Sequence, residues 1–111
     1  MTKAIEEKTE TINRIIHSLV KIYNPLEIYI FGSYAWGTPD SESDIDFAVI
    51  IEKSNLDMAK RIRLATDELW DIEIPTDILV YTKNEIQEKA KYISTLQYRI
   101  ITEGTKIYEA A

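Results

Sequence analysis

Two aspartates separated by a single residue are the strongest chemical signal in this sequence. Asp44 and Asp46 stand at the start of an apolar segment that runs to Ile51 and is typical of a buried strand. Side chains two residues apart on a strand leave the same face, with their backbones about 6.5–7 Å apart. Paired carboxylates of this kind favour a hard cation such as Mg²⁺ or Mn²⁺, and two such ions can stabilise both oxygens of an in-line phosphoryl displacement.

A glycine–serine pair precedes these aspartates, with ten residues between the two motifs. Gly32 follows an apolar segment and has no Cβ, so the backbone there can approach a ligand closely. Ser33 adds a hydroxyl at a point where the free amides of a following helical turn would face an anion. We therefore interpret Gly32 and Ser33 as a phosphate-binding turn, with an ordinary Gly-Ser turn as the alternative.

A third carboxylate, Asp77, stands inside the otherwise apolar segment 75–80, PTDILV. An ionised group in such a segment is costly unless it is paired or bound to a metal. Phosphoryl transfer to a hydroxyl also needs an oxygen base or a metal to take the proton of that hydroxyl. Asp77 is therefore our candidate for a third metal ligand or for the base, and an edge strand that leaves Asp77 in water is the alternative.

The segments around these residues alternate between helical and extended patterns. Helical spacing and short β-branched runs predict a helix over 5–23, strands over 26–31, 44–51 and 75–81, a helix from Ser54 or Asn55 to about 71, and helical structure over 84–103 with a break near 92–94. At most a short helical turn is expected between Gly32 and Gly37. This order predicts an α/β (α+β) fold, a small mixed β-sheet packed with helices, as a single domain over residues 1–111.

The composition restricts the class of protein. The chain has no cysteine, so it offers neither a disulfide nor a thiolate metal site, and we expect a cytoplasmic location. No window approaches the about 18 apolar residues of a membrane span, so we expect no membrane partner. The net charge of −6 disfavours nucleic acid as the main partner, because the nucleic acid backbone is itself a polyanion.

Two further groups of residues have both a functional and a structural interpretation. One is the basic cluster of Lys53, Lys60, Arg61 and Arg63. This cluster could meet a triphosphate or an acidic partner, but we expect it to be a solvated helix face. The other is the pair of Tyr34 and Trp36, which could stack on a base or face a partner, or could pack beneath the phosphate-binding turn.

Residues 31–37, FGSYAWG, followed by residues 43–47, SDIDF, resemble the signature of the DNA polymerase beta-like nucleotidyltransferase superfamily. The length of the chain is similar to that of the minimal nucleotidyltransferases, the MNT proteins encoded beside HEPN partners. The resemblance implies a small mixed sheet with helices. It also implies that Gly32 and Ser33 bind the triphosphate, and that Asp44, Asp46 and Asp77 bind two Mg²⁺ ions and provide the catalytic carboxylates.

The same resemblance implies a function. The chain would transfer AMP from ATP to a hydroxyl, expected to be a tyrosine, of a partner HEPN ribonuclease toxin, and would thereby act as the antitoxin. Many relatives carry arginine at the position of Trp36, so a positive contact to phosphate is either missing here or supplied elsewhere.

Two other hypotheses stay open at this stage. The chain could be a non-catalytic binding module that neutralises a partner by covering its surface, which the small size, the acidic charge and Trp36 favour. It could instead nucleotidylate RNA or an antibiotic, although the acidic charge disfavours RNA. Either a homo-oligomer or a hetero-oligomer is compatible with the sequence.

Overall fold

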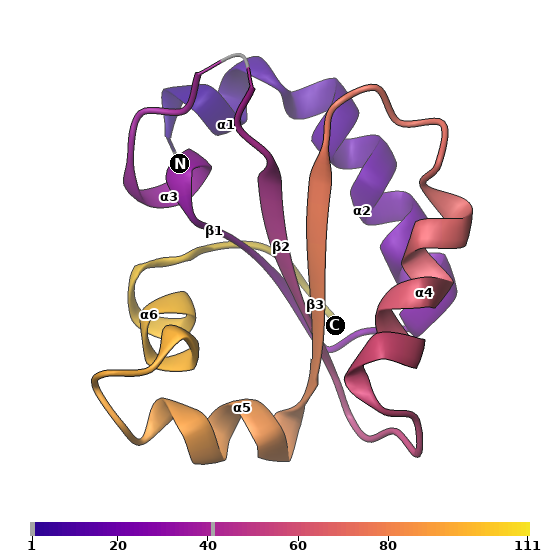
Figure 1. The fold of residues 1–111 in the computed structure, drawn as a ribbon, viewed down its shortest axis with the longest axis vertical. Coiled ribbons are helices and arrows are strands. Elements are labelled where there is room, and N and C mark those ends of the chain that lie inside the picture. The colour runs from indigo at the N-terminus through magenta and orange to yellow at the C-terminus, as the bar shows by residue number, and fades with distance from the viewer. Residues whose placement is uncertain (1, 41) are drawn as a thin grey trace.

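The structure, a computed structural model, describes residues 2–40 and 42–111, which form helices and strands that largely follow the predicted order (Figure 1). In chain order the elements are α1 (Lys3–Glu7), α2 (Thr9–Tyr23), β1 (Glu27–Phe31), α3 (Ser33–Trp36), β2 (Ile45–Ile51), α4 (Met58–Glu68), β3 (Thr76–Thr82), α5 (Lys83–Ala90), α6 (Leu96–Glu103) and β4 (Thr105–Glu109).

The strands form one mixed sheet in the order β3-β2-β1-β4. β2 runs parallel to β3, whereas β1 runs antiparallel to both β2 and β4. This arrangement confirms the predicted mixed α/β architecture. The pairing also sets two registers that matter for the site, because Asp46 is paired with Phe31 of β1 on one side and with Asp77 of β3 on the other.

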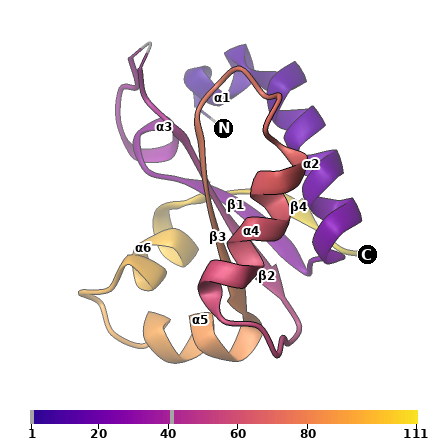
Figure 2. The ribbon, with the colours of Figure 1, turned by 45° about the vertical axis from the view of Figure 1, so that its right-hand side comes forward.

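Helices cover both faces of the sheet (Figures 1 and 2). α1, α2 and α4 lie on one face, where Ile15 and Leu19 pack with Phe47 in the larger apolar core. α5 and α6 lie on the other face, where Ile86 and Ile100 pack in a second core. Alternate residues of β1, β2 and β3 enter alternate cores, so every side chain on β2 can be assigned to one face.

The predicted first helix is divided in two. α1 ends at Glu7 and α2 begins at Thr9, with Lys8 between them in a non-helical conformation. Thr2 caps α1 by accepting a hydrogen bond from the Ile5 N–H, and its hydroxyl donates to the Tyr34 carbonyl over 2.7 Å. A contact to the turn after β1 therefore holds α1 in place, and no local helical pattern could have indicated it.

α4 is shorter than predicted, and one of its basic residues is buried rather than solvated. Asp57, rather than Ser54 or Asn55, caps the helix by accepting from the Lys60 N–H over 2.9 Å. Arg61 was expected on a solvated face, but its side chain is buried and its guanidinium forms an ion pair with Glu85 over 2.6 Å. The basic cluster is therefore not a single solvated surface.

The C-terminal segment contains both a confirmed and a missed feature. The predicted break near residues 92–94 is present, since α5 ends at Ala90 and α6 begins at Leu96. β4 was not predicted. Only Ile107 and Tyr108 of its five residues are strongly apolar, and its extended form depends on pairing with β1 at the edge of the sheet.

None of the helices formed by residues 2–40 and 42–111 is long and apolar enough to cross a membrane.

Candidate active site

The glycine–serine turn and the second aspartate are in direct contact. Gly32 has φ +74°, and a Cβ built at this position would lie 2.0 Å from the Oδ2 atom of Asp46. A positive φ favours glycine, and here the absent side chain also leaves the space that the Asp46 carboxylate occupies. The glycine–serine turn therefore lies directly against the carboxylate of Asp46.

Ser33 begins α3, the short helical turn expected after Gly32. The amides of Ala35 and Trp36 both donate to the Gly32 carbonyl, over 3.0 and 2.8 Å. The amides of Ser33 and Tyr34 precede the first closed turn, so they cannot be bonded within the helix. These two N–H groups and the Ser33 hydroxyl directly follow Gly32, which contacts the Asp46 carboxylate, and they could hold an anion there.

The three candidate aspartates come from one end of the parallel pair β2 and β3. Phe47 and Ile78 enter the larger core, so the alternation of the strands directs Asp46 and Asp77 to the opposite face, the face of α5 and α6. Asp46 is half-buried and paired in register with Asp77, which is exposed on the edge strand. Asp44 is exposed and stands one residue before β2, so the predicted strand begins one residue later than expected.

Burial is the main cause that raises the pKa of Asp46 from 3.8 to about 6, and the charges of Asp77 and Asp44 add to it. Asp77 is paired in register with Asp46 and Asp44 lies two residues before it, so the three carboxylates share one region. A cation bound among them would relieve this repulsion, and oxygen donors are the ligands that Mg²⁺ prefers.

The carboxylates have not converged into a metal cage. Over residues 2–40 and 42–111, no three His, Cys, Asp or Glu side chains are arranged so that they could hold a metal ion as they stand. The donor chemistry of Asp44, Asp46 and Asp77 nevertheless fits Mg²⁺.

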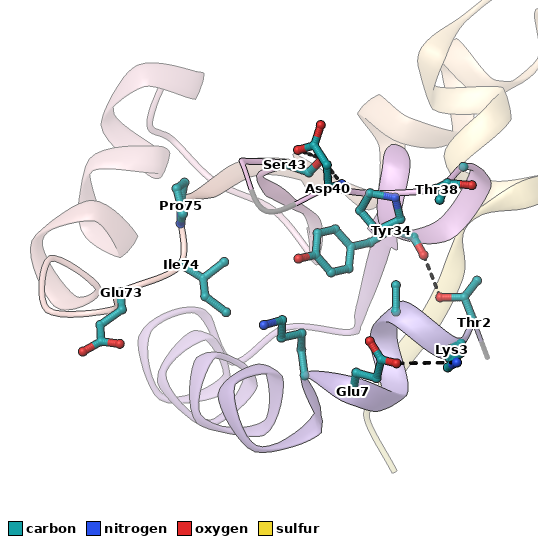
Figure 3. Close-up of a pocket in the computed structure, with 14 residues that line it drawn as sticks. Thr2, Lys3, Glu7, Tyr34, Thr38, Asp40, Ser43, Glu73, Ile74 and Pro75 are labelled. Atoms are coloured by element: carbon teal, nitrogen blue, oxygen red, sulfur yellow. Dashed lines mark hydrogen bonds and ion pairs between the residues drawn. The ribbon is translucent and has the colours of Figure 1, made fainter.

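A groove of about 620 Å³ lies on the other side of the turn (Figure 3). Three segments line this groove. They are the α1 region (Thr2, Lys3 and Glu7), the segment before β3 (Ile74 and Pro75) and the segment after β1 (Tyr34, Gly37, Thr38 and Asp40). The three candidate aspartates, Gly32 and Ser33 are not among its lining residues. Tyr34 is buried and joins the larger core, so it packs beneath the turn.

Trp36 packs between two other side chains. Its ring lies 6.1 Å from that of Phe31, and the Arg99 guanidinium carbon lies 3.8 Å from its centroid. At Trp36 we expect a positive contact to phosphate to be either missing or supplied elsewhere, and the sequence does not predict the contact of Trp36 with Arg99. No local pattern distinguishes Arg99 from the other basic residues of the helices, and only the packing of α6 against the turn reveals it.

Comparison with known proteins identifies the family. Residues 13–111 match the family described as Polymerase beta, Nucleotidyltransferase. No curated protein matches the sequence. Among solved structures, the fold is similar to a putative nucleotidyltransferase from Sulfolobus solfataricus, with a TM-score of 0.66 and 20% identity over 98% of this chain and 89% of that one.

Two further structures are more similar in sequence. A chain from a crystal structure of a toxin-antitoxin with AMP-PNP aligns with a TM-score of 0.63 and 28% identity, over 88% of this chain and 73% of that one. A chain from a mutant of the toxin-antitoxin MntA-HpeT aligns with a TM-score of 0.59 and 29% identity, over 88% and 72%.

The family match covers all four strands and the glycine–serine and aspartate motifs. The mixed sheet is consistent with the nucleotidyltransferase fold. This chain belongs to the polymerase beta nucleotidyltransferase family and is a nucleotidyltransferase.

Proposed function

We propose that this chain transfers AMP from ATP to a tyrosine hydroxyl of a HEPN-type toxin encoded nearby, and that it acts as the antitoxin of that toxin. The observation that carries the proposal is the contact of the Asp46 carboxylate with the backbone of Gly32, beside Asp77 on the next strand. The partner class and the donor rest on the similarity to a toxin-antitoxin solved with AMP-PNP, which is an analogue of ATP.

In this proposal Gly32 and Ser33 hold the triphosphate, because their backbone can approach it closely and the amides at the start of α3 can donate to it. Asp44, Asp46 and Asp77 would hold two Mg²⁺ ions. Bound there, such ions neutralise phosphate charge and stabilise the attacking and departing oxygens of the displacement.

Asp77 has a second role in the proposal. It is exposed on the edge strand, so an acceptor hydroxyl can reach its carboxylate. The acceptor oxygen forms a bond to the α-phosphorus of ATP, the bond from that phosphorus to pyrophosphate breaks, and the acceptor proton moves to Asp77. A protein acceptor is also compatible with the net charge of −6, which would repel a polyanionic acceptor.

The proposal is tested by incubating the protein with Mg²⁺, ATP labelled at the α-phosphate and the purified product of the adjacent gene. We expect label on a tyrosine of that partner, located by mass spectrometry of its peptides. The variant Asp44→Asn, Asp46→Asn should lose the transfer, whereas Asp67→Asn, Glu68→Gln, which changes two exposed carboxylates of α4, should retain it.

Two results would count against the proposal. The first is a parent protein that neither binds ATP nor labels the partner. The second is a double variant of Asp44 and Asp46 that protects cells from the partner as well as the parent does, because neutralisation would then need only the binding of one protein to the other.

A further inference from the structure

We propose that Arg99 of α6 binds the two outer phosphates of the nucleotide and provides positive charge at this site. The inference rests on the proposed function, since it assigns a residue to the triphosphate that Gly32 and Ser33 are proposed to hold. It starts from one contact, the stacking of the Arg99 guanidinium on Trp36, whose carbon lies 3.8 Å from the ring centroid.

Trp36 connects this arginine to the glycine–serine turn. The Trp36 amide donates to the Gly32 carbonyl over 2.8 Å, so the indole is attached to the same helical turn that begins at Ser33. The other neighbour of the ring is Phe31, which precedes Gly32 and is paired in register with Asp46. Arg99 is therefore held beside the turn, on the face of the sheet to which Asp46 and Asp77 project.

Stacking leaves the guanidinium able to bind an anion. A stacked arginine uses its flat face, whereas its N–H groups point outward from the edge and can bind a phosphate in two places. Within the described residues, the one side-chain hydrogen bond of Arg99 runs from Nε to Glu103 over 3.1 Å. The two terminal nitrogens thus remain available on a side chain that is 50% exposed.

The ion pair with Glu103 does not prevent this role. The Arg99 and Glu103 side chains are 50% and 56% exposed. Exposed ion pairs four residues apart on a helix contribute little to stability. A multiply charged triphosphate can therefore displace Glu103 or share the guanidinium with it. Release of Glu103 would leave the stacking contact with Trp36 unchanged.

The position of Trp36 also indicates that stacking holds this arrangement. The indole Nε1 is buried and has no hydrogen-bond partner among residues 2–40 and 42–111. Buried donors normally have a partner. Because Nε1 has none among the described residues, no hydrogen bond within them orients the indole ring. Its orientation comes from contact with Phe31 and Arg99, which couples the position of the guanidinium to the end of β1.

The test compares the affinities of Arg99→Gln and the parent for AMP-PNP and for AMP, measured by calorimetry with Mg²⁺ present. Loss of a charged hydrogen-bonding group should weaken AMP-PNP binding by about 10-fold to 100-fold. The affinity for AMP should fall much less, because AMP lacks the two outer phosphates. Arg63→Gln, an exposed arginine of α4, is the matched control and should bind both nucleotides as the parent does.

Three further results complete the test. Glu103→Gln should bind AMP-PNP at least as tightly as the parent, because the competing carboxylate is gone. Unchanged AMP-PNP binding by Arg99→Gln would overturn the inference, and so would an equal loss for AMP-PNP and AMP, which indicates a general disturbance of the site. A parent that does not bind AMP-PNP would instead overturn the proposed function on which the inference rests.

Discussion

The carboxylate of Asp46 occupies the space that a side chain at residue 32 would need, with Oδ2 2.0 Å from the position of a Cβ at Gly32. The obstructing atom is the end of a side chain, so a residue larger than glycine would displace the carboxylate rather than prevent folding. Gly32 and Asp46 are therefore coupled, and changes at one should be detected at the other.

Gly32→Ala should reduce nucleotidyl transfer strongly and stability only moderately. Gly32 has φ +74° and ψ −153°, a conformation in which alanine costs on the order of 1–3 kcal/mol, while displacement of the Asp46 carboxylate by about 1 Å can lower a rate on the order of 100-fold. The measurements are the transfer rate and the urea midpoint. Gly37→Ala is the control, because a Cβ there would make ordinary contact with Ser33 at 3.6 Å, and both quantities should stay near those of the parent.

Asp46→Asn should stabilise the metal-free protein at pH 7.5 but not at pH 4. Burial and the charges of Asp77 and Asp44 raise the pKa of Asp46 from 3.8 to about 6. Between these two pH values Asp46 keeps its proton in the folded state and loses it in the unfolded state. The stability of the parent therefore falls as pH rises from about 4 to 6 and then levels off. Asparagine avoids this loss, which we place at about 1 kcal/mol after solvent screening.

Thermal unfolding of parent and variant between pH 4 and pH 8, with a chelator present, measures this effect. The gain in Tm should be absent at pH 4 and reach several degrees above pH 6. Asp67→Asn, at an exposed position of α4, serves as the control. A gain from Asp46→Asn that is the same at every pH would contradict the assignment, because it would not depend on the charge of Asp46.

Mg²⁺ should stabilise the parent at pH 7.5 through Asp44, Asp46 and Asp77. An ion at about 100 times its dissociation constant stabilises the folded state by about 2.7 kcal/mol per site, which a thermal shift assay detects. The double variant Asp44→Asn, Asp46→Asn should show no shift. If Mg²⁺ shifts the Tm of this variant as far as that of the parent, the ion binds elsewhere.

Arg61→Ala should destabilise the protein much more than Arg63→Ala, the change of the other arginine in α4. The buried guanidinium donates to the carbonyls of Leu56 and Val80 and pairs with Glu85, so its loss leaves several acceptors unsatisfied. We expect a loss of about 3 kcal/mol in the free energy of unfolding, measured by urea denaturation. Arg63→Ala, at an exposed position of the same helix, should change it by less than about 0.5 kcal/mol.

Much of the fold follows from local patterns in the sequence. The three strands of the motif begin and end within one residue of their predicted bounds, because each is a short apolar segment bordered by turn-forming residues. The break between α5 and α6 was also predicted. β4 was missed because its conformation depends on pairing with β1, a contact between segments far apart in the chain.

The candidate site divides in the same way. Gly32, Ser33, Asp44, Asp46 and Asp77 could be selected from residue type and spacing, because carboxylates at strand positions and a glycine after a strand have recognisable chemistry. Their contacts could not be selected in this way. The Oδ2 atom of Asp46 lies 2.0 Å from the position of a Cβ at Gly32 because β1 pairs antiparallel with β2. Asp77 lies beside Asp46 because β2 pairs parallel with β3.

By itself the sequence determined which residues can do chemistry and which segments carry them, because residue type and short-range periodicity are local properties. Only the tertiary structure decided which of those residues meet. It buried Arg61 against Glu85, and it stacked Arg99 of α6 on Trp36 of the turn. Such contacts join segments distant in sequence, and they are determined by how apolar faces pack rather than by any pattern along the chain.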